Sequence, residues 1–304
     1  MNAEAKPQPH SVTAATPAAE LASIPDPGPL PRFDGAGAMQ FTRQVVAFGP
    51  RWPGSAGYRK LQRFLRAQLK ADNLEEDTFT ASTPAGPLRM TNFIAKYPGT
   101  KDGIIVVAGH YDTLYGRTNF AGANDGGSST GLLLQLAKDL RAQMSGGKLQ
   151  GYSVWLVWLD GEEAIRQWSD TDSLYGSRHL AEKWQQSGVL GKIKGFILVD
   201  MIGDADLNIV RDVNSTQWMG RLVWEAARRY GYQSHFFAQE AAIQDDHIPF
   251  VMRGVPAVDL IDFDYGYNNA YWHTKDDTLD KLSPRSFELA GSVVAETIRL
   301  LDLK

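Results

Sequence analysis

The sequence contains no cysteine among its 304 residues. Disulfide bonds and thiolate ligands are therefore excluded, and any bound metal must be held by histidine and carboxylate side chains. No apolar run reaches the roughly 18 residues that a membrane-spanning helix needs. The formal net charge is only −4, and no basic stripe or polybasic anchor is present. Nucleic acid and membrane partners are therefore not expected, and small or peptidic partners are favoured.

The N-terminal segment lacks the features of a targeting signal. Residues 1–31 are rich in Ala and Pro, and they have neither the charged start nor the apolar centre of a signal peptide. We expect residues 1–34 to form a flexible arm and residues 35–304 to form one domain. We also expect a secreted or periplasmic protein whose leader is absent from this sequence.

Apolar periodicity predicts the order of the elements in that domain. Residues 38–48 and 56–69 have helical spacing, and residues 78–81 and 90–97 alternate like two strands of an antiparallel edge. Further along the chain, short apolar runs predict buried strands at residues 104–108, 154–159, 196–199 and 255–261, with amphipathic stretches for covering helices. This pattern predicts a single α/β domain with a central twisted, mixed but mostly parallel sheet flanked by helices.

Side chains that can bind metal occur at the carboxyl ends of these strands, where ligands bind in open α/β sheets. They are His110, Asp112, Asp125, Glu162, Glu163, Asp200 and His273. Each alone has an ordinary explanation, such as a helix cap for Asp125 or core packing for His273. Their recurrence at successive strand exits favours one shared site. Zinc suits these ligands, and Glu163 can face the metal while Glu162 faces a substrate and moves protons.

Five ordered motifs resemble the clan of zinc aminopeptidases and glutaminyl-peptide cyclotransferases over roughly residues 40–302. The motifs are His110-Tyr111-Asp112, Asn124-Asp125, Asp160-Gly161-Glu162-Glu163-Ala164, Val199-Asp200-Met201 and Trp272-His273-Thr274. The stretches at residues 79–84, 168–180 and 244–256 are similar to the cyclase branch in particular. The resemblance therefore implies a glutaminyl cyclase, which converts an N-terminal glutamine of a peptide or protein to pyroglutamate and releases ammonia.

The resemblance also implies the ligands and the proton carrier of that reaction. Asp125, Glu163 and His273 would bind one catalytic zinc ion, which acts as a Lewis acid toward the side-chain amide of the substrate. Glu162 would take a proton from the attacking α-amine and deliver it to the leaving ammonia.

The remaining site residues follow from the same resemblance. Asp200 and Asp245 would form an acidic hydrogen-bond network with Glu162. The pocket for the N-terminal glutamine would be lined by Trp168, Gln244 and Trp272. Core packing is the ordinary explanation for the tryptophans, but their positions in the motifs favour substrate contact.

Two other functions remain open at the level of sequence. In a di-zinc aminopeptidase, His110 and Asp200 would complete a second metal site, so two zinc ions are possible. A non-catalytic binding domain on the same fold is disfavoured, because all the ligands and Glu162 are retained. Trp168 and the segment 244–250 favour the cyclase over the peptidase.

Overall fold

The structure is a computed structural model that describes residues 28–304. Its main sheet has the strand order β1-β2-β4-β3-β5-β8. The strands are β1 (Asn73–Thr83), β2 (Gly86–Tyr97), β3 (Gly99–His110), β4 (Leu149–Leu159), β5 (Ile193–Asp200) and β8 (Ala257–Ile261). The pairs β1/β2 and β2/β4 are antiparallel, whereas β4/β3, β3/β5 and β5/β8 are parallel. The predicted mixed, mostly parallel sheet with an antiparallel edge is confirmed.

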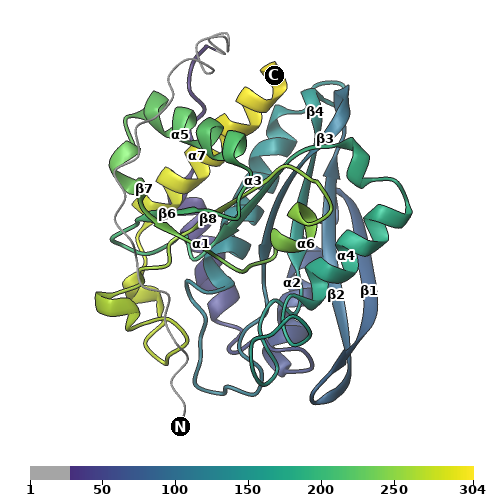
Figure 1. Cartoon of the computed structure of the whole chain (residues 1–304), viewed down its shortest axis with the longest axis vertical. Helices are drawn as coiled ribbons and strands as arrows, with labels where there is room; N and C mark the ends of the chain where they lie inside the picture. The colour runs from purple at the N-terminus through teal and green to yellow at the C-terminus, as the bar shows by residue number, and fades with distance from the viewer. Residues whose placement is uncertain (1–27) are drawn as a thin grey trace.

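Helices cover both faces of this sheet (Figure 1). One face packs against α1 (Gly35–Val46), α2 (Ala56–Gln68), α3 (Gly127–Gln143), α5 (Gln217–Tyr230) and α7 (Pro284–Leu303). The other face packs against α4 (Tyr175–Gln186) and α6 (Ile248–Val251). Both faces are apolar because side chains alternate along each strand, so Ile105 and Val107 enter the first core while Val106 and Ala108 enter the second.

Several smaller elements were not predicted from the sequence. β6 (Ile209–Asp212) and β7 (Phe236–Ala241) form a separate two-stranded parallel sheet. Short 3-10 helices occupy Leu190–Lys192, Gln233–His235, Tyr267–Asn269 and Leu279–Lys281. Within residues 28–304, no helix is both long enough and apolar enough to cross a membrane.

The described part of the expected arm contacts the domain. Tyr230 donates a hydrogen bond to the carbonyl of Pro31, Arg299 donates one to Pro29, and the side chain of Phe33 is buried. Asp34 caps α1 by accepting the backbone N–H of Gly37 at 2.8 Å. Residues 1–27, where most of the arm was expected, lie outside the described residues.

Candidate metal centre

The parallel pairing of the central strands brings their carboxyl ends to one edge of the sheet. His110 is the last residue of β3 and lies in register with Leu159, the last residue of β4. Asp200 ends β5, which is the other neighbour of β3. The loop after β4 continues to Glu162 and Glu163. The backbone therefore gathers the residues that the sequence singled out at the strand exits.

One group of ligands combines Asp125, Glu163 and His273. The Nε2 atom of His273 lies 3.4 Å from Asp125 Oδ2 and 3.4 Å from Glu163 Oε2. Asp125 comes from the loop before α3, and His273 comes from the loop after β8 in a left-handed backbone conformation (φ 56°). Side chains from three separate loops thus converge on one point.

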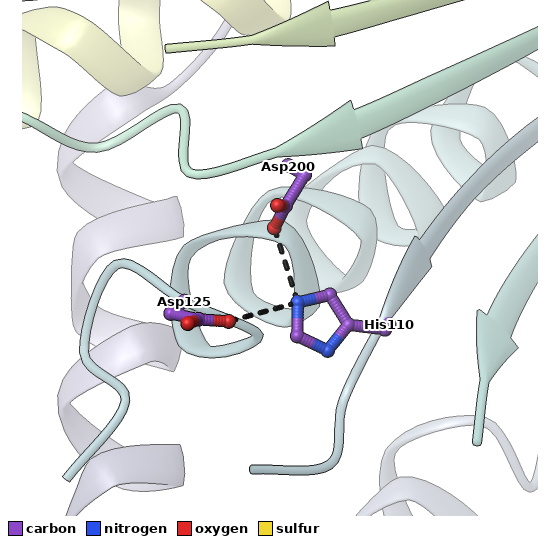
Figure 2. Close-up of side chains that lie close together, drawn as sticks. All are labelled: His110, Asp125 and Asp200. Atoms are coloured by element: carbon purple, nitrogen blue, oxygen red, sulfur yellow. Dashed lines mark hydrogen bonds and ion pairs between the residues drawn. The ribbon is translucent and has the colours of Figure 1, made fainter. Parts of the chain in front are cut away.

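A second group consists of His110, Asp125 and Asp200 (Figure 2) and shares Asp125 with the first. The Nε2 atom of His110 lies 3.1 Å from Asp125 Oδ1 and 3.1 Å from Asp200 Oδ1. Asp125 therefore offers one carboxylate oxygen to each group. The alternative of a second metal, with His110 and Asp200 as ligands, has a geometric basis.

The first group fits a zinc ion by the chemistry and the spacing of its donors. Tetrahedral zinc with ligand bonds near 2.0–2.1 Å places neighbouring donor atoms roughly 3.3–3.4 Å apart. Both carboxylate oxygens of Glu163 and Oδ2 of Asp125 are buried without a hydrogen-bond partner among the described residues. Burial and the neighbouring Asp125 raise the pKa of Glu163 to about 8. A bound cation would satisfy these oxygens and keep Glu163 ionised.

The ligand loops are held by polar residues that sequence reasoning did not identify as part of the site. The fully buried Arg51 donates hydrogen bonds to the carbonyls of Ala121 and Gly122, both at 2.7 Å. Asp277 accepts the backbone N–H groups of Asn124 (2.8 Å) and Asp125 (3.2 Å). Neither residue lies at a strand exit, so the pattern that revealed the ligands carried no signal for them.

Asp112 also serves the backbone. It was grouped with the residues that can bind metal, but its carboxylate accepts the N–H groups of Glu162 (3.1 Å) and Glu163 (3.3 Å). It belongs to neither of the two groups of ligands at the sheet edge. Asp112 thus fixes the turn that aims the paired glutamates.

Glu162 is buried beside the first group, with 8% of its surface exposed. Burial raises its pKa well above the ordinary value; His110 opposes this effect, and Glu163 and Asp245 add to it. Asp245 is also buried, and burial together with Asp200 raises its pKa. The structure therefore gathers Glu162, Asp200 and Asp245 in one acidic region. Direct hydrogen bonds from Glu162 to the two aspartates remain a prediction.

The expected pocket residues come from three different loops. Trp272 is half-buried and stacks on His273 with ring centroids 4.0 Å apart, and it also contacts Phe263 edge-on at 5.0 Å. Trp168 is half-buried in the loop after Glu163, and Gln244 is exposed in the segment after β7. Partial exposure suits side chains that contact a substrate, but the contact itself remains a prediction.

Comparison with known proteins gives a consistent result. The sequence profile of Peptidase family M28 matches residues 92–298. The glutaminyl-peptide cyclotransferase-like protein of Bos taurus is 34% identical over 272 residues, which cover 81% of this chain and 70% of that protein. The crystal structure of an Acidobacteriales bacterium glutaminyl cyclase is 50% identical, with a TM-score of 0.87, and the match covers 92% of this chain and 98% of that one. A Zn-dependent exopeptidase from Parabacteroides distasonis, 24% identical with a TM-score of 0.79, covers 89% of this chain and 99% of its own, and it shares the fold.

Proposed function

Because this chain belongs to the glutaminyl-peptide cyclotransferases within peptidase family M28, we propose that it cyclises N-terminal glutamine with one zinc ion held by Asp125, Glu163 and His273. The observation that carries this proposal is the convergence of these three side chains, with Nε2 of His273 3.4 Å from both carboxylates. When bound there, zinc would polarise the side-chain amide of the substrate and stabilise negative charge on its oxygen.

Glu162 is the residue of this chain that moves the proton. Its backbone N–H is held by Asp112, and its side chain is buried next to the ligand Glu163. As a carboxylate it accepts a proton from the α-amine of the substrate as the amine nitrogen attacks the amide carbon. The same carboxyl group then returns the proton to the departing ammonia, so one residue serves both steps.

The acidic residues behind Glu162 support its uptake of the proton. Buried Asp200 and Asp245 lie in the same acidic region, and negative charge there makes deprotonation of Glu162 less favourable. Glu162 is therefore a strong enough base to accept the proton that the attacking nitrogen gives up, and it releases this proton to the departing ammonia. On the substrate side, Trp168, Gln244 and Trp272 would enclose the glutamine side chain and orient its amide.

His110 supports the choice of one zinc ion. Burial lowers the pKa of His110, but Asp200, Asp112 and Asp125 outweigh this effect and raise it well above the ordinary value. The Nε2 atom of His110 lies 3.1 Å from an oxygen of Asp125 and from an oxygen of Asp200, so an N–H there can bridge the two carboxylates without a second metal. An aminopeptidase with two metals instead requires His110 to be neutral and ligated.

Mass spectrometry of two peptides tests the proposed function. The purified enzyme is incubated with a peptide that begins with glutamine and with a matched peptide that begins with leucine. We expect the first peptide to become lighter by one ammonia and the second to remain intact. Release of free glutamine or free leucine would contradict the proposal and support the aminopeptidase.

A further inference from the structure

A second buried imidazole lies between two carboxylates away from the metal centre. The Nε2 atom of His247 lies 3.0 Å from Asp212 Oδ2, and its Nδ1 atom lies 3.8 Å from Asp259 Oδ2. All three side chains are completely buried. Asp212 ends β6, Asp259 lies in β8, and His247 directly precedes α6. The contact therefore joins the small sheet, the main sheet and the loop after β7.

The spacing of these three side chains would allow them to hold a metal ion, but Asp212 differs from the zinc ligands in already having donors of its own. The two nitrogens of His247 face different carboxylates: Nε2 faces Asp212, and Nδ1 faces Asp259, whose oxygens have no hydrogen-bond partner among the described residues. Asp212 is already occupied: Oδ1 accepts the N–H groups of Asn214 (3.0 Å) and Ile243 (2.9 Å), and Oδ2 accepts the Ser215 hydroxyl (2.7 Å). Because Asp212 is fixed by its own donors, its contact with His247 holds the loop that carries His247 in place.

Asp212 and His247 hold the two ends of the segment 243–247. At the first end, Ile243 donates its N–H to Asp212 and accepts a 2.7 Å hydrogen bond from the Asn214 amide. At the other end, His247 contacts the same Asp212 carboxylate. The exposed Gln244 and the buried Asp245 lie between these anchors.

We infer that Asp212 and His247 are a positioning pair for the glutamine pocket. They fix the position of the segment that carries Gln244 toward the substrate and Asp245 into the acidic region around Glu162. This inference rests on the proposed function, and it assigns the pair no contact with the reacting atoms. Its consequence is that the Asp212 side of the imidazole controls both substrate affinity and turnover.

Two matched amide variants separate the two sides of the imidazole. In His247→Gln the side-chain nitrogen can take the place of Nε2 and donate to Asp212. In His247→Asn the shorter amide stays near the position of Nδ1 and faces Asp259. We expect His247→Gln to keep kcat/KM within about threefold of the parent, and His247→Asn to lose about 30-fold, as for loss of one hydrogen bond to a charged group.

The division between kcat and KM distinguishes positioning from a general loss of folded enzyme. A partly unfolded preparation lowers the apparent kcat and leaves KM unchanged. In His247→Asn we expect KM to rise and kcat to fall together, with the zinc content of the parent. His235→Gln, which changes a half-buried histidine in the 3-10 helix Gln233–His235, is the matched control and should behave like the parent.

Hydrogen–deuterium exchange measures the position of the segment without reference to activity. We expect the amide of Ile243 to exchange faster in His247→Asn than in His247→Gln, because its acceptor Asp212 is no longer held. Equal kinetics and equal exchange in the two variants would overturn the inference. A metal ion that is bound by the parent and by His247→Gln but lost from His247→Asn would also overturn it. If the parent enzyme forms no pyroglutamate, the proposed function is contradicted instead. The exchange result then still decides whether Asp212 and His247 hold the segment 243–247 in place.

Discussion

Two buried clusters of this protein contain the same kinds of side chain, two carboxylates and an imidazole, and they differ in where the carboxylate oxygens find partners. In the first cluster, Asp125 Oδ2 and both oxygens of Glu163 have no hydrogen-bond partner among the described residues, and His110 contacts the other oxygen of Asp125. Around Asp212, backbone N–H groups and a hydroxyl already occupy both oxygens. Residue type alone therefore does not identify a metal site. In the first cluster both carboxylates offer an oxygen without a hydrogen-bond partner, whereas in the second only Asp259 does, because Asp212 is already occupied.

Neutralising one carboxylate in each cluster should separate the two clusters most clearly. Glu163→Gln removes a charged ligand, so we expect loss of bound zinc and a fall in cyclisation of about 10⁴-fold. Asp259→Asn in the second cluster should leave zinc bound. Elemental analysis of both purified variants, together with their rates, is the measurement. Zinc retained in Glu163→Gln, or lost in Asp259→Asn, would reverse the assignment of the two clusters.

Glu162→Gln tests whether Glu162 transfers the proton and takes no part in binding zinc. The amide keeps the shape of the side chain but cannot accept the proton, so we expect turnover to fall by about 10³-fold while zinc stays bound. Single-turnover rates and zinc per chain are measured on the same sample. A fully active variant would exclude Glu162 as the proton carrier.

The pH dependence of stability distinguishes buried carboxylates whose pKa is lowered from those whose pKa is raised. Burial raises the pKa of Asp212, but His247 and backbone N–H groups outweigh this and lower it. Asp262 accepts the N–H groups of Asn208 and Asp264, yet its burial raises its pKa to about 7. A lowered pKa contributes stability that is lost as the pH falls. A raised pKa contributes stability that is present below the unfolded pKa and is lost as the pH rises toward 7.

We therefore expect Asp262→Asn to reduce the loss of stability between about pH 5 and about pH 8 by about 2–3 kcal/mol. Urea unfolding of parent and variant at both pH values measures this difference. An identical pH dependence in the two proteins would show that Asp262 does not carry the raised pKa. Asp212, whose partner is an imidazole, should instead contribute most above its ordinary pKa.

The smallest expected effect concerns the pocket. Trp168→Ala should raise KM for a glutamine-initiated peptide by about tenfold, because an apolar wall of the pocket is lost. Trp168→Phe retains an aromatic face and should change KM by less than about threefold. Initial rates over a range of peptide concentrations give the values. An unchanged KM in Trp168→Ala would place Trp168 outside the pocket.

The main sheet and the residues that can bind metal could both be predicted from the pattern of buried strands. Buried strands have continuous apolar runs, and the ends of parallel strands meet at one edge, so residues such as His110 and Asp200 could be placed without long-range information. The resemblance supplied the roles of Glu162 and Glu163. The paired glutamates look alike in sequence, and only their surroundings separate a ligand from a proton carrier.

The supporting residues could not be predicted by the same reasoning. Arg51 and Asp277 act on backbone groups far away in the chain, and Asp277 lies 153 positions from Asn124, whose N–H it accepts. A side chain that bonds to backbone leaves no spacing pattern, because its partner can be any residue. The β6/β7 sheet was missed because each of its strands is short and β6 spans only Ile209–Asp212. His247 was part of a motif, but its partners become evident only in the fold.

The central claim is that the cluster of Asp125, Glu163 and His273 binds one zinc ion and that this ion is needed for cyclisation. It is tested most directly by adding zinc back to chelator-treated enzyme while following pyroglutamate formation from a glutamine-initiated peptide. We predict that activity returns in proportion to zinc and reaches its maximum at one equivalent per chain. Full activity without zinc, or a maximum at two equivalents with release of free glutamine, would contradict this account.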